Sequence, residues 1–101
     1  MTKVRWTQTA LGGLESIHAF IARESPGLAR QVIERLVKAV EILEEFPESG
    51  RVVPERGDPA FRELVRAPYR VIYEHVDGIA NILTVFHSAR RLPDDFDSAA
   101  R

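Results

Sequence analysis

In the first half of the chain, apolar residues recur every three or four positions, the spacing of a helix with one buried face. The first run ends at about Glu24 and begins after Thr7 or Thr9, either of which can cap it, and the residues Val4–Trp6 before it favour a short strand. The glycine pair at 12–13 weakens the first turns, so this end of the helix either frays or crosses another element closely.

A second helical run follows at once. Ser25 and Pro26 supply a capping residue and a proline at the first helical position, and the apolar spacing continues to about Phe46. The charged residues of this run fall opposite its apolar ones, as on a solvent-exposed face. The pattern predicts a helical hairpin.

The second half of the chain changes period. Residues 45–60, EFPESGRVVPERGDPA, hold proline and glycine too densely for a regular element and predict a loop. The segments 61–67, 68–76 and 79–87 are rich in β-branched and aromatic residues, and Asp77-Gly78 between the last two is typical of a type I′ turn. Three consecutive antiparallel strands are expected.

This order predicts an α+β fold, in which an N-terminal strand and a helical hairpin pack on a mainly antiparallel sheet that ends in a three-strand meander. A chain of 101 residues supports one core, so residues 1–101 are expected to form one domain, with 93–101 either a flexible tail or a docking segment. One hairpin face, with Val71, Tyr73 and Leu83 or their neighbours, is expected to close the core. The other face would present Arg70.

Charge and composition narrow the classes of function. The 14 basic and 15 acidic residues leave a formal charge of −1, which argues against binding nucleic acid mainly by neutralising phosphates. Cysteine is absent, which excludes disulfides and thiolate chemistry, and no stretch is long and apolar enough for a membrane span. All but Lys3 and Lys38 of the basic residues are arginine, a poor proton-transfer base.

Five segments, in this order, resemble the ParE/RelE superfamily of bacterial toxins: VRWTQTALGGLESIHAFIA, EILEEFPESGR, FREL, PYRVIYE and ILTVFHSARR. The resemblance implies the toxin of a type II toxin–antitoxin or plasmid-stabilisation pair, a cytoplasmic protein without cofactor or metal. It also implies a ParD-like antitoxin as partner in a hetero-oligomeric complex, with operator DNA contacted only through that antitoxin.

Members of the superfamily resemble one another in fold but differ in target. The RelE-like branch cuts messenger RNA on the ribosome, and the ParE-like branch acts on DNA gyrase. Cleavage by a 2′-hydroxyl needs a base, a cation and an acid. Arg70 could supply the cation, joined by Arg62, Arg90 and Arg91, and Glu63 or His87 could supply the base. The lysines that the RelE type uses from this region, however, have no counterpart after Lys38.

Two observations favour the ParE-like branch: the incomplete catalytic set, and a surplus of only 5 − 3 = +2 charges over residues 61–91. The expected function is therefore inhibition of DNA gyrase by a toxin that is not itself an enzyme. The alternatives are a RelE-like endoribonuclease and an inactive paralogue that only binds its antitoxin and helps to regulate their operon.

The resemblance and the surface pattern together indicate two binding regions. The target-binding residues are expected to be His87, Arg90, Arg91 and Leu92. The antitoxin is expected to fill an apolar groove lined by Leu11, Leu14, Leu28 and Val32. Structural roles remain open for two of the candidates, since Arg70 could pair with Glu63 or Glu74 and His87 could hydrogen-bond a loop.

Overall fold

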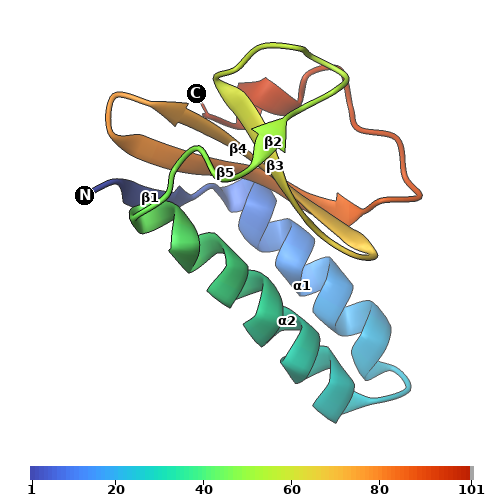
Figure 1. Cartoon of the computed structure of the whole chain (residues 1–101). Helices are drawn as coiled ribbons and strands as arrows, with labels where there is room; N and C mark the ends of the chain where they lie inside the picture. Colours follow the sequence, from blue (N-terminus) through green and yellow to red (C-terminus); the bar gives the residue numbers. More distant parts are fainter. Residues whose placement is uncertain (101) are drawn as a thin grey trace.

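The computed structural model describes the backbone of residues 1–100 and the side chains of residues 1–98 (Figure 1). A helical hairpin of α1 (Gln8–Ala22) and α2 (Pro26–Glu41) covers one face of a five-stranded sheet. Two short 3₁₀ turns, η1 (Ile42–Glu44) and η2 (Phe96–Ala100), complete the α+β fold that the sequence predicted. The strands are β1 (Lys3–Trp6), β2 (Arg51–Val52), β3 (Phe61–Arg66), β4 (Tyr69–Val76) and β5 (Ile79–His87).

The strands lie in the order β1-β5-β4-β3-β2. The predicted meander of β3, β4 and β5 is confirmed. The helical hairpin carries the chain from one edge of the sheet to the other, so β1 pairs with β5, in parallel, at the edge opposite β2. The turn at Asp77-Gly78 has φ of 51° and 73°, the left-handed pair of a type I′ turn. The sequence did not predict β2, which lies inside the proline-rich loop.

Both helices begin at the residues that local chemistry favours. The Thr7 hydroxyl oxygen accepts a hydrogen bond from the Ala10 N–H at 3.1 Å and donates one to the Ile82 carbonyl at 2.6 Å, so it caps α1 and fixes it to β5. Ser25 caps α2 by accepting from the Leu28 N–H at 3.3 Å. The 3₁₀ turn η1 replaces the last turn of the longer helix that the periodicity predicted.

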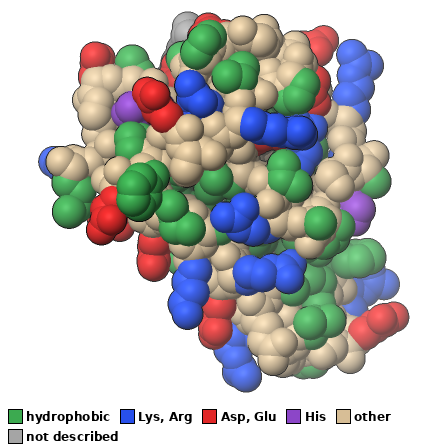
Figure 2. All heavy atoms as spheres, viewed as in Figure 1, with side chains coloured by type: hydrophobic (Ala, Val, Ile, Leu, Met, Phe, Trp, Pro, Cys, Tyr) green, Lys and Arg blue, Asp and Glu red, His purple; other side chains and the backbone are tan. Residues whose placement is uncertain are grey.

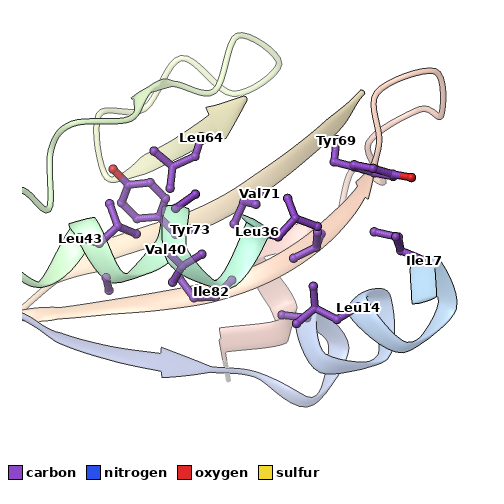
Figure 3. Packing of buried hydrophobic residues seen from close by; sticks show 14 of the residues in the cluster. Leu14, Ile17, Leu36, Val40, Leu43, Leu64, Tyr69, Val71, Tyr73 and Ile82 are labelled. Carbon is purple, nitrogen blue, oxygen red and sulfur yellow. The ribbon is translucent and has the colours of Figure 1, made fainter. Parts of the chain in front are cut away.

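The main core lies between the helices and the sheet. Figure 3 shows side chains of α2 and η1 pointing toward Val71, Tyr73 and Ile82 of the hairpin. Leu83 does not join them, and its predicted place in this core is wrong. A bulge in the β4–β5 register turns Leu83 to the opposite sheet face, where it packs with Ile72 in a second cluster.

The close crossing that Gly13 allows is present. A β-carbon at this position would lie 2.4 Å from the Val85 carbonyl oxygen, whereas one at Gly12 would have no neighbour within 4 Å. Only Gly13 is therefore required for α1 to reach β5.

These two glycines give a matched test of that contact. Gly13→Ala should lower the free energy of unfolding by about 1–3 kcal/mol, because the helix must move away from a rigid backbone. Gly12→Ala should raise it by about 0.5–1 kcal/mol through helix propensity. Urea unfolding of both variants measures the difference, and equal effects would contradict the close crossing.

The loop before β2 is anchored by Tyr73. The Tyr73 hydroxyl donates to the Pro47 carbonyl at 2.7 Å and accepts from the Gly50 N–H at 3.0 Å. Burial raises the pKa of Tyr73. Folding thus favours the neutral phenol. The stability that this preference contributes is complete below about pH 10 and is lost as the pH rises above it.

Tyr73→Phe should therefore lower the free energy of unfolding by about 1–3 kcal/mol, since it leaves two loop groups without their partner. Its stability should also fall less than that of the parent chain above about pH 10. Tyr69→Phe is the control, because the Tyr69 hydroxyl makes no hydrogen bond to the described residues. If thermal unfolding showed the same stability and the same pH dependence for both variants, this role of the Tyr73 hydroxyl would be refuted.

Candidate functional site

A buried carboxylate lies on the sheet face opposite the helices. The Glu63 side chain on β3 is 0% exposed, and each of its oxygens accepts a hydrogen bond from an arginine. Arg70 on β4 donates through Nε to Oε1 at 2.6 Å, and Arg51 on β2 donates through Nε to Oε2. Glu63 thus joins three strands.

Arg70 is itself held from a second side. Its two terminal nitrogens donate to both carboxylate oxygens of Glu55 at 2.8 and 2.9 Å, and its guanidinium lies 5.2 Å from the centroid of the Phe86 ring. The Glu55 hydrogen bond, followed by that of Glu63, raises the pKa of Arg70, and the same contact lowers the pKa of Glu55. Two acids and two arginines therefore form a closed network with no net charge.

This network leaves little chemistry available at Glu63 or Arg70. A general base needs an accessible lone pair, but both Glu63 oxygens are buried against guanidinium groups. A phosphate-binding arginine needs free donors, but Arg70 directs its donors to Glu55 and Glu63. Pairing between Arg70 and Glu63, which was one of the alternatives raised by the sequence, is confirmed; Glu55 is the partner that the sequence did not suggest.

The four candidate catalytic residues do not form one group. Glu63 and Arg70 lie on the face opposite the helices, whereas Arg62 lies across from Tyr73 on the helix-facing side and donates to the Gly50 carbonyl at 3.1 Å. The ring of the fourth, His87, also lies on the helix-facing side. The sheet therefore separates one pair from the other.

His87 marks the end of β5, where a loop hydrogen bond holds it. Its Nδ1 accepts from the Ala89 N–H at 3.0 Å, so the neutral ring carries its proton on Nε2. The ring packs edge-on against Tyr69, with centroids 5.6 Å apart. The side chain is nevertheless exposed, and Nε2 remains able to contact another molecule.

The other three predicted target-binding residues differ in their exposure to solvent. Arg90 and Arg91 are exposed, and Arg91 has a single loose contact of 3.8 Å with the Asp94 carboxylate. Leu92 is buried in the second cluster, so it anchors the segment and offers no surface of its own.

Beyond Leu92 the chain folds back over the sheet. Phe96 packs edge-to-face on Phe61 at 5.5 Å, and the Arg56 guanidinium lies 5.0 Å from the centroid of the Phe61 ring and 4.7 Å from that of Phe96. Arg56 also donates to Asp97 at 3.0 Å, a contact that raises the pKa of Arg56. Of the predicted tail 93–101, the described part thus covers the sheet face that carries Glu63, and residue 101 lies outside the described residues.

The four residues expected to contact an antitoxin also differ in their exposure to solvent. Leu14 and Val32 belong to the main core beneath the helices, so they present almost no surface. Leu11 and Leu28 are 39% and 51% exposed. Phe20, which was not among the predicted residues, is 71% exposed, and its position off the apolar stripe of α1 could have indicated this from the sequence.

A metal site and a membrane-spanning helix are both absent from the described residues. No group of three or more His, Asp or Glu side chains among them could hold a metal ion, and none of the described helices is long and apolar enough to cross a bilayer. On the face shown in Figure 2, positive side chains are spread among apolar and acidic ones rather than merged into one basic surface.

Comparisons with known proteins agree with this fold. The model of the ParE toxin of type II toxin–antitoxin systems, parDE, matches residues 4–92. The candidate toxin Y4kP of Sinorhizobium fredii is 40% identical over 93 residues, covering 90% of this chain and 93% of that protein. Toxin RelE2 of Caulobacter vibrioides is 37% identical over 91 residues, covering 89% of this chain and 99% of that protein.

A solved structure described as the chromosomal ParDE toxin–antitoxin system of P. aeruginosa has the same fold. It superposes with a TM-score of 0.70 at 22% identity, covering 86% of this chain and 96% of the matched chain. The family match spans the strand, the hairpin and the meander that hold the sites described above. The chain belongs to the ParE toxin family of type II toxin–antitoxin systems.

Proposed function

We propose that this toxin acts in the cytoplasm by inhibiting DNA gyrase, without being an enzyme itself, and that a ParD-like antitoxin neutralises it. The observation that carries the proposal is the internal pairing of Glu63 with Arg51 and Arg70. A ribonuclease of this fold would need its acid, base and cation on one accessible face. Here the candidates are paired internally or separated by the sheet.

The exposed end of β5 and the segment after it form the surface that we assign to the target. His87, Arg90 and Arg91 combine a free imidazole N–H with two guanidinium groups, which suits an acidic patch on a protein. The buried side chain of Leu92 anchors this segment to the second cluster. Protein contacts of this kind require no reacting atom.

A second candidate function follows from one comparison. The relative from Caulobacter vibrioides is named a RelE toxin, and this favours a messenger ribonuclease as the alternative. In that case His87 would have to act without Glu63 and Arg70. The two functions differ in a direct assay.

That assay places purified toxin with DNA gyrase and relaxed plasmid, and in parallel with ribosomes translating a defined messenger. Loss of supercoiling or trapped cleaved DNA, with the messenger intact, is the expected result. Site-specific cutting of the messenger at the ribosome would replace the first proposal by the second. Inactivity in both assays, with antitoxin binding retained, would indicate the inactive paralogue.

The target-binding segment can be tested by substitution. Arg90→Ala combined with Arg91→Ala should lose most growth inhibition while changing the free energy of unfolding by less than about 1 kcal/mol, because both side chains are exposed. Leu36→Ala, at a fully buried position, should cost about 2–5 kcal/mol and lose activity only through unfolding. A double-arginine variant that is folded and fully toxic would contradict the assignment.

A further inference from the structure

Arg56, in the loop between β2 and β3, contacts the chain just after the segment assigned to the target (Figure 1). Its two terminal nitrogens donate to the Asp97 carboxylate at 3.0 Å and to the Asp94 backbone carbonyl at 3.4 Å. Its guanidinium lies 5.0 Å from the centroid of the Phe61 ring and 4.7 Å from that of Phe96. A planar cation held by hydrogen bonds and by two aromatic rings is fixed in both position and orientation. The Arg56 side chain therefore clasps the returning chain to the sheet.

The loop presents Arg56 from a fixed turn. Val53 is fully buried in the second cluster, and its carbonyl accepts hydrogen bonds from the N–H of Arg56 at 3.1 Å and of Gly57 at 2.9 Å. Gly57 has φ of 72°, a conformation that glycine adopts without strain. The preceding residue, Glu55, binds both terminal nitrogens of Arg70 on β4. The backbone that carries Arg56 is thus tied to the sheet by its neighbours on the N-terminal side.

The target-binding segment, residues 87–92, is held by different kinds of contact at its two ends. At the β5 end, the Ser88 N–H donates a directed hydrogen bond to the Pro68 carbonyl at 2.7 Å. At the other end, Leu92 is buried in the second cluster, but an apolar contact has no preferred direction. The hydrogen bonds and ring contacts of Arg56 supply direction at this end. The arrangement of the exposed residues between the two ends therefore depends on Arg56.

We propose that Arg56 is a positioning residue for the target-binding segment: by clasping the chain that follows, it holds Arg90 and Arg91 in the arrangement that the target recognises. This inference rests on the proposed function and adds to it a residue that acts without touching the target. Its physical basis is preorganisation, because a segment that is already ordered loses less conformational entropy when it binds. Release of the clasp should weaken inhibition of DNA gyrase and leave the main core intact.

Hydrogen exchange tests the local effect of the clasp. Arg56→Met keeps a long side chain but removes its charge and its donors. Exchange of the backbone amides of residues 88–98 should become about tenfold faster through local opening, and exchange in α2 should be unchanged. Arg56→Lys keeps a charge for Asp97 but loses the planar group, so its rates should lie between those of the parent chain and of Arg56→Met. Equal acceleration in both regions would mean that Arg56 only supports the whole fold, and would overturn the proposal.

The same variants are then compared for inhibition of supercoiling by DNA gyrase. The toxin concentration needed for half inhibition should rise about tenfold for Arg56→Met and less for Arg56→Lys, in the order of their exchange rates. Arg5→Met is the matched control, because Arg5 donates to the Asn81 side chain at 2.7 Å near the beginning of β5. This control should alter neither the exchange of residues 88–98 nor the inhibition.

The two measurements distinguish failure of this inference from failure of the function on which it rests. If the parent chain inhibits gyrase and Arg56→Met inhibits it equally well, or if Arg56→Met leaves the exchange of residues 88–98 unchanged, Arg56 is not a positioning residue, although the proposed function stands. If the parent chain itself does not inhibit gyrase, both proposals fall.

Discussion

The pairing of Glu63 with two arginines is the constraint on which the rest of the sheet depends. A carboxylate removed from water is stable only when charged hydrogen bonds replace its hydration, and loss of one partner from such a pair costs about 3–5 kcal/mol. Arg51 and Arg70 supply those bonds from the strands on either side of β3. The short strand β2 and the loop that carries Glu55 are thereby fixed to the meander.

This pairing also divides the polar groups of the molecule between the two sides of the sheet. The face opposite the helices holds the neutral network and the folded-back chain around Phe96, so its polar groups serve one another. Arg90 and the exposed imidazole of His87 lie instead at the end of β5, beside α1. One side of the sheet thus holds the paired network, and the rim of the other carries exposed polar groups.

Much of the fold could be predicted from local pattern. Helical spacing, the Ser25-Pro26 start and the Asp77-Gly78 turn each act within a few residues, and each led to the correct element. Leu83 was assigned to the wrong face because alternation assumes an unbroken register, and a bulge depends on the partner strand.

The candidate site was less predictable, because its contacts join distant parts of the chain. The partners of Arg70 lie 7 and 15 residues away, one of them in a loop without regular structure. Leu14 and Leu11 look alike in sequence, but the angle at which α1 packs makes one core and the other surface. Phe20 is 71% exposed because its position on α1 lies off the buried stripe.

The central claim is that Glu63 and Arg70 hold the fold and perform no chemistry, and a double substitution tests it most directly. Glu63→Gln combined with Arg70→Met removes both buried charges together and leaves without their partners only Arg51 and Glu55, whose side chains reach solvent, and such a change is often tolerated. Growth inhibition by this variant should be measured beside its melting temperature. The account predicts a folded and toxic protein; a variant that melts like the parent chain but no longer arrests growth would show that these residues belong to the active machinery.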